Sequence, residues 1–377
     1  MTAVFRASHA IRAQFFVLGV LFATWGVHVP TVKSLYGLGE QALALAMLAS
    51  GVGALLALAQ AGRVVGRWGP RAVSGTMGVL CCAAIACLLA WPVYPALLAV
   101  MAVFGITGSL LDVAINTEAT EVEHQSGRPL MSGFHGMFSL GGMAGASFGS
   151  VAPGLGLSAQ GHLLLATGLG AALTLLASRA MLPVPERAAE EKHPLSLPRG
   201  PLLLLGVLAA MGLVAEGAMY DWSVLFMKQE RGSSASHAAL AYASFSGAMA
   251  AGRFAGDWVR ARLSGAVLMR FSGVLAASGM ALGLLVPSPA VALLGFALVG
   301  LGLSNVVPVL FSAASKVPGI SSAHGIAAVS GVGYLGMMAG PPLIGLVAEH
   351  ASLAAGLWVV VVFAGFMALS ARRAMRA

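Results

Sequence analysis

The sequence predicts an all-α polytopic membrane protein with twelve transmembrane helices in two six-helix repeats. Of its 377 residues, 58% are hydrophobic and only 9% are charged, whereas a soluble domain carries about 25% charged residues. Three long stretches contain no Asp, Glu, Lys or Arg at all, namely 72–111, 129–178 and 271–315. A helix of about 20 apolar residues crosses a bilayer, so each stretch has room for two spans.

The first six predicted helices are apolar runs that stop at a charge, a glycine or a proline. They cover 12–32, 42–62, 72–91, 96–120, 131–153 and 160–181. The residues that mark their ends are Lys33, Arg63, Pro92, Glu121, Pro153 and Pro183. The short connections between them are typical of neighbouring helices in one bundle.

The second six helices are predicted by the same rules at 201–227, 236–256, 264–286, 289–314, 322–347 and 352–371. Their ends are marked by Lys228, Asp257, Pro287, Lys316, Glu349 and Arg372. The one long polar connection in the chain is 183–199. We therefore expect an N-terminal bundle at 1–182, a cytoplasmic linker at 183–199 and a C-terminal bundle at 200–377.

The distribution of basic residues predicts the orientation, because cytoplasmic loops carry the excess of Lys and Arg. With both termini in the cytoplasm, every Lys and Arg except Lys33, Lys228 and Arg231 falls on the cytoplasmic side. The net charge of +8 is then explained by membrane topology, so no nucleic-acid partner is expected. We expect a multi-pass protein of the inner (plasma) membrane whose first helix is retained rather than cleaved as a signal peptide.

An internal repeat relates the two halves. Residues 61–68 read AGRVVGRW and residues 251–258 read AGRFAGDW, with five of eight positions identical at an offset of 190. His135-Gly136 and His324-Gly325 match at an offset of 189. These pairs predict equivalent helices in the two bundles, with both histidines at helix starts on the cytoplasmic side.

The segment Gly62 to Arg71 resembles the glycine- and arginine-rich loop between helices 2 and 3 of the major facilitator superfamily. It keeps the glycines and two arginines of that motif, but Gly66 stands at the acidic position, and the second copy has an acid at Asp257. The strings 216–222 (EGAMYDW) and 134–142 (FHGMFSLGG) are similar to a narrower MosC-like branch, which is associated by name with the inositol-derived compound rhizopine.

The resemblance implies a secondary transporter that works by alternating access, with helices 1, 4, 7 and 10 around a central cavity. It also implies a tight basic cytoplasmic turn at the loop motif, and the repeat gives the paired histidines a structural role at the inner rim, such as capping or gating, with metal binding as the alternative. These residues are Gly62, Arg63, Arg67, Arg71, Gly252, Arg253, Asp257, His135 and His324.

A polar stripe in the fourth helix points to one candidate for proton coupling. Ser109, Asp112, Asn116 and Thr120 recur at helical spacing and therefore share one face. An ionisable group at mid-helix costs about 2.5–3.5 kcal/mol on insertion scales, so Asp112 needs a compensating role. It either carries a proton or contacts substrate in a cavity, with Asn116 beside it, or the stripe is a hydrogen-bonded seam between helices.

The seventh helix supplies the second candidate, Glu216. Tyr220 is four residues away and shares its face, whereas Asp221 is turned by about 140°. We therefore favour Glu216 for proton coupling and Tyr220 for substrate binding. Asp221 lies closer to the outer interface, where it either contacts substrate or belongs to the interfacial belt.

Three further residues are candidate substrate ligands. Trp25 and His28 share a stripe on the first helix, where Trp25 has a ring that can stack on a sugar face. The alternative for His28 is a satisfied buried histidine. Asn305 precedes Pro308, so it either contacts substrate or satisfies backbone carbonyls that the proline leaves free.

These residues favour a proton-coupled importer of a small polar solute, and the resemblance to the MosC-like branch implies a sugar or an inositol derivative. The alternatives are a proton-antiport exporter of drugs or metabolites and a non-transporting receptor or scaffold. We expect no enzyme activity, because no HExxH, CxxC or Walker-type glycine loop is present. No cofactor or metal is expected, and a monomer is the expected state.

Overall fold

The structure is a computed structural model that describes residues 3–128, 130–183, 199–318, 320 and 322–375. Every regular element within these residues is a helix. The described residues fall into two compact units, one holding those up to 183 together with 233–243, and the other holding 199–232 and those from 244 on. The predicted linker 183–199 lies outside the described residues apart from its first and last positions, and the domain boundaries stay a prediction.

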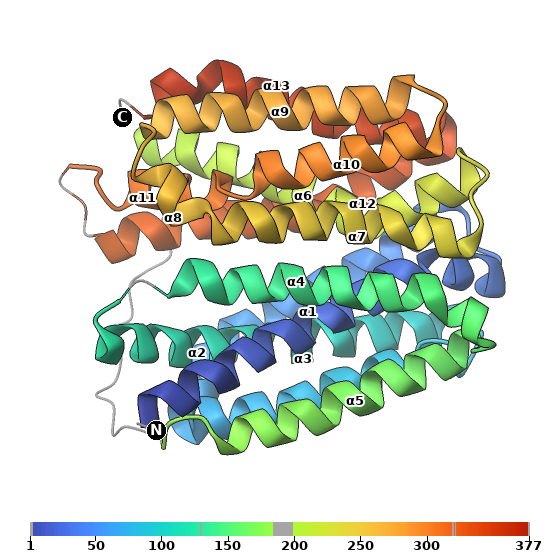
Figure 1. Cartoon of the computed structure of the whole chain (residues 1–377), viewed down its shortest axis with the longest axis horizontal. Coiled ribbons are helices and arrows are strands. Elements are labelled where there is room, and N and C mark those ends of the chain that lie inside the picture. The colour runs from blue at the N-terminus through green and yellow to red at the C-terminus, as the bar shows by residue number, and fades with distance from the viewer. Residues whose placement is uncertain (1–2, 129, 184–198, 319, 321, 376–377) are drawn as a thin grey trace. The chain divides into compact units, whose positions relative to one another are not determined.

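The first unit begins with α1 (Ala3–Tyr36) and is drawn mainly from blue to green in Figure 1. Its other elements are α2 (Glu40–Ala86), α3 (Tyr94–Ser126), α4 (Met131–Val151), the short 3-10 helix η1 (Ala152–Leu155) and α5 (Ala159–Arg179). α1 packs against α4 and α5, and α2 packs against α3 and α5. Polar residues around the turns support these helix ends: Lys33 forms a 2.9 Å ion pair with Glu40, and the Ser158 hydroxyl accepts a hydrogen bond from the Gly161 amide.

Helix α2 (Glu40–Ala86) contains the second and third predicted spans and reverses direction between them. A straight helix of 47 residues would be about 70 Å long. Yet Tyr36, before its start, donates a hydrogen bond at 2.8 Å to the carbonyl of Leu88, after its end. The reversal occurs at Gly69, whose φ is 79°, a conformation open to glycine but strained for other residues. Pro70 follows at a position where a helix tolerates proline.

Glycines allow the backbones of α1 and α4 to approach closely. A Cβ added to Gly19 would collide with the carbonyl of Phe138, and one added to Gly141 would collide with the carbonyl of Phe16. Helices in a bilayer associate through close packing of this kind, because moving apolar side chains from lipid to a helix interface gains little free energy. The many glycines of the sequence therefore act as packing residues here.

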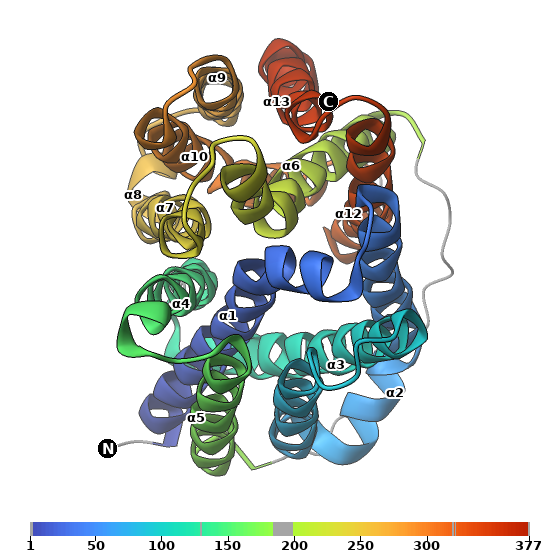
Figure 2. The ribbon, with the colours of Figure 1, turned by 90° about the vertical axis from the view of Figure 1, so that its right-hand side faces the viewer.

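The second unit consists of α6 (Pro201–Gln229), most of α7 (Ala235–Phe254), α8 (Gly256–Arg260), α9 (Gly265–Leu285), α10 (Pro289–Leu303), α11 (Val306–Ala314), α12 (Ser322–His350) and α13 (Leu353–Ala374). In this unit α9 packs against both α10 and α13, and α6 packs against α12 and α13 (Figure 2). The tenth predicted span is thus divided into α10 and α11.

Nine helices of the described chain are long and apolar enough to cross a membrane. Among them α2 counts once although it holds two predicted spans, and α10 with α11 counts as a single span. The helices α4 and α7, which are rich in glycine and serine, account for the other two predicted spans. Helices therefore occupy all twelve predicted positions, and the predicted all-α membrane fold is confirmed.

Candidate functional site

A buried ionic cluster joins α6 to α7 in the second unit. Arg253 Nη2 lies 2.9 Å from Glu216 Oε1, and the Tyr220 hydroxyl donates a hydrogen bond to the same oxygen at 3.1 Å. The side chains of Glu216 and Arg253 are only 10% and 15% exposed. Charges removed from water stabilise each other only at short distance and with hydrogen bonds, and both conditions are met. We call Glu216, Tyr220 and Arg253 the acid–arginine cluster.

The helical repeat explains how the sequence assembles this cluster. Glu216 and Tyr220 are four residues apart on α6, so they share a face as predicted. On α7, Phe245, Met249 and Arg253 are also spaced by four. The Tyr220 ring packs edge-on against Phe245 at 5.1 Å, and its hydroxyl reaches Met249 Sδ at 3.6 Å. One face of α7 therefore covers one face of α6, with the ion pair at its end.

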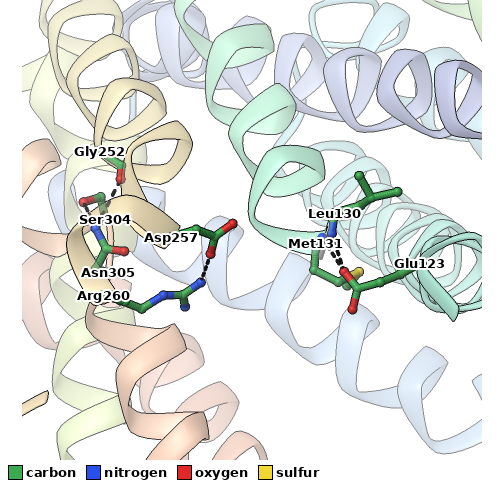
Figure 3. A network of polar contacts seen from close by, with 8 residues as sticks. All are labelled: Glu123, Leu130, Met131, Gly252, Asp257, Arg260, Ser304 and Asn305. Carbon is green, nitrogen blue, oxygen red and sulfur yellow. Dashed lines mark hydrogen bonds and ion pairs between the residues drawn. The ribbon is translucent and has the colours of Figure 1, made fainter. Parts of the chain in front are cut away.

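The break between α10 and α11 is tied to the same end of α7. Asn305 Nδ2 donates hydrogen bonds to the carbonyl of Gly252 at 3.2 Å and to Ser304 Oγ at 3.0 Å (Figure 3). A Cβ on Gly252 would collide with the Ser304 side chain, so glycine is required for this approach. Pro308 has no N–H to donate a helical hydrogen bond to the Ser304 carbonyl, which explains why the helix breaks here. Asn305 thus contacts backbone next to the cluster, and its binding of substrate stays a prediction.

The polar stripe predicted on the fourth span lies on α3 and is hydrogen-bonded along its own helix. Asn116 Nδ2 donates to both the side-chain Oδ1 and the carbonyl of Asp112, each at 2.9 Å. The Thr120 hydroxyl donates to the Asn116 carbonyl at 2.9 Å. Asp112 and Asn116 are half-buried. The amide therefore holds the Asp112 carboxyl in place on its own helix.

His28, predicted as a substrate ligand, lies in a buried histidine pair. Its Nε2 is 2.8 Å from Nδ1 of His162 on α5, and its Nδ1 is 3.4 Å from the Thr31 hydroxyl. His28 and His162 are 7% and 2% exposed. The His162 ring also packs against Phe148 at 4.8 Å. This geometry matches the alternative of a satisfied buried histidine better than that of a ligand facing an open cavity.

The two copies of the glycine–arginine motif differ in structure. Gly62, Arg63 and Arg67 lie in the first half of α2, where Arg63 is exposed and donates to Gln60 Oε1 at 2.8 Å. In the second copy the helix breaks after α7, and the exposed Asp257 pairs with Arg260 on α8 (Figure 3). The sequence grouped Arg253 with this loop motif, but the structure brings its guanidinium to Glu216 instead.

The other predicted residues take up separate positions. His135 and His324 lie in the first two turns of α4 and α12, as the repeat predicts, and the His135 ring is 5.1 Å from Phe15. Trp25 is buried on α1, whereas Asp221 is half-buried on α6. Among the residues that the structure describes, no three His, Cys, Asp or Glu side chains gather as metal ligands.

Residues 13–323 match the model of the Major Facilitator Superfamily. The chain belongs to the major facilitator superfamily. An uncharacterized MFS-type transporter of Yersinia pestis is 36% identical over 97% of this chain and 95% of its own length. The membrane protein MosC of Rhizobium meliloti is 32% identical over 93% of this chain and 86% of its own length. The predicted resemblance to MosC is thereby confirmed.

Solved structures of other transporters share the superfamily fold. A D-xylose-proton symporter aligns with a TM-score of 0.77 at 14% identity, over 98% of this chain and 97% of its own. The nucleoside transporter NupG aligns in a mutant form with a TM-score of 0.73 at 16% identity, over 100% of this chain and 99% of its own. At these identities the comparison supports the fold and not the solute.

Sequence reasoning on this superfamily member missed the backbone contacts of two acidic side chains and one buried histidine partner. Glu123 Oε2 accepts hydrogen bonds from the amides of Leu130 and Met131 at 2.5 and 2.8 Å, which caps the start of α4 (Figure 3). The buried Glu118 accepts one from the Leu182 amide at 2.6 Å. His162 was not considered because nothing near it in sequence distinguishes it. The acidic residues that precede the glycine turn could have predicted the cap, because acidic side chains stabilise the N-terminus of a helix.

Proposed function

We propose that this transporter takes up a small polar solute, such as a sugar or an inositol derivative, together with protons. The observation that carries the proposal is the acid–arginine cluster inside a membrane-spanning helix pair. Ionisable residues in such spans are rare and costly, and they commonly line substrate or proton pathways. The likeness to MosC, whose branch is associated by name with the inositol-derived compound rhizopine, favours this solute class.

The cluster offers a way to couple a proton to a change in structure. Proton binding to Glu216 removes the negative charge that holds Arg253 at 2.9 Å, so the guanidinium becomes available to another acceptor. The Tyr220 hydroxyl can then turn to a new acceptor as well. We propose that solute oxygens serve as those acceptors, which would make proton and solute binding interdependent.

Asp112 is the second proposed proton site, with Asn116 as its positioning partner. We retain Trp25, Asn116, Tyr220, Asp221 and Asn305 as the predicted substrate contacts, whereas the contact of His28 with His162 favours a structural role for that residue. The distribution of Lys and Arg supports the proposal that both termini lie in the cytoplasm. We also propose that the protein is a monomer in the inner membrane.

The direct test is solute accumulation by the purified protein in liposomes, screened against polyols, amino sugars and cationic drugs with and without a pH gradient. We expect uphill accumulation of a polyol or amino sugar when protons flow inward. Asp112→Asn or Glu216→Gln should abolish accumulation while solute exchange persists. The control Glu349→Gln changes an exposed carboxylate at the end of α12 and should accumulate normally.

Two outcomes would overturn the proposal. Unchanged uphill transport in both carboxyl variants would remove Asp112 and Glu216 as proton carriers. Accumulation of cationic drugs in exchange for outward protons would favour the exporter instead.

A further inference from the structure

An open groove of about 560 Å³ lies on the first unit, between the second half of α2 and the end of α5. Trp68 and Arg71 line it near the reversal of α2, and Ser178 of α5 adds a hydroxyl. Val79 and Leu80 line it farther along α2. The groove therefore has a cationic and polar end and an apolar end, all within one unit.

The groove is long enough and exposed enough to hold one acyl chain of a phospholipid. Arg71 and Leu80 are nine residues apart on a helix, which places them about 13 Å from each other along its axis. Trp68 and Leu80 are 63% and 45% exposed, so both present apolar surface outward from a membrane-spanning helix. Tryptophan gathers at the interface between headgroups and acyl chains, which places the Arg71 end at headgroup level.

We propose that this groove binds an anionic phospholipid, with its phosphate against the Arg71 guanidinium and an acyl chain along Val79 and Leu80. Arginine binds phosphate oxygens through two parallel N–H donors, which makes it the better side chain for this contact than lysine. The exposed Arg67 lies four residues before Arg71, on the other side of the reversal at Gly69, and does not line the groove. Charge complementarity thus selects an anionic lipid over a zwitterionic one.

The preference can be measured by quenching of Trp68 fluorescence in reconstituted full-length protein. The quenchers are phosphatidylglycerol and phosphatidylcholine with brominated acyl chains, mixed into the bilayer. Subtraction of the signal of a Trp68→Phe variant isolates this tryptophan from the other five. Near a membrane surface one arginine favours an anionic lipid by about fivefold, so we expect half-quenching at about one fifth of the mole fraction for phosphatidylglycerol.

Substitutions at Arg71 decide whether the groove causes the preference. Arg71→Gln should make the mole fraction at half-quenching equal for the two lipids. Arg71→Lys should retain part of the preference, and it serves as the control that a substitution at this position permits folding. The matched control is Arg63→Gln, which removes an exposed arginine outside the groove and should leave the preference intact. Equal quenching by both lipids in the parent protein, or a preference that survives Arg71→Gln, would overturn the proposal. The test does not depend on which solute is transported.

Discussion

Replacing either Glu216 or Arg253 alone should lower the free energy of unfolding strongly, whereas replacing both should lower it little. The two side chains are 10% and 15% exposed and 2.9 Å apart, so either charge left alone would be buried without its partner. Removing one member of a buried pair costs about 3–5 kcal/mol, while replacing both with apolar residues is often close to neutral. We therefore expect Arg253→Met and Glu216→Leu each to lower the free energy of unfolding by about 3–5 kcal/mol.

The double variant Glu216→Leu/Arg253→Met should lose less stability than either single variant. Unfolding by SDS in mixed micelles, followed by circular dichroism, gives the four free energies of the cycle. The control is Asp257→Asn, which breaks an ion pair whose side chains are 50% and 33% exposed and should cost at most about 1 kcal/mol. Additive single effects, or an Arg253→Met effect no larger than the control, would refute the burial argument.

Three other substitutions test contacts in the first unit. Gly141→Leu should lower the free energy of unfolding by about 1–3 kcal/mol through overpacking of α1 against α4; an unchanged SDS midpoint would contradict this packing. Glu123→Ala should cost about 1 kcal/mol and speed hydrogen exchange in the first turn of α4 alone. His162→Leu should cost about 1–3 kcal/mol because His28 loses its partner, and adding His28→Leu should recover part of that loss if the two rings are in contact.

Local sequence patterns predicted the helices and their faces because both depend on neighbouring residues. The four-residue spacing of Glu216 and Tyr220 placed them on one face, and the structure joins them by a hydrogen bond. The Gly69-Pro70 pair lies between the second and third predicted spans. The predicted loop from Gly62 to Arg71 proved to be mostly helical, because one glycine with positive φ is enough to reverse the chain.

Contacts between distant segments were beyond what the sequence could predict. Arg253 sits in a loop-like motif, yet its long side chain reaches back along α7 to α6, and only the packing of these helices determines that direction. His28 and His162 are 134 residues apart, and no periodicity relates them. Equivalent sequence motifs also differ in environment, since the exposed Arg63 donates to Gln60 on its own helix while Arg253 pairs with a buried acid on another helix.

Proton movement driven by solute tests the coupling claim most directly. Proteoliposomes that contain a pH-sensitive dye and no pH gradient would receive an inward gradient of the transported solute. The proposed mechanism predicts acidification of the lumen with parent protein, and solute entry without acidification in Asp112→Asn or Glu216→Gln. Solute entry through the parent protein with no change in luminal pH would contradict it.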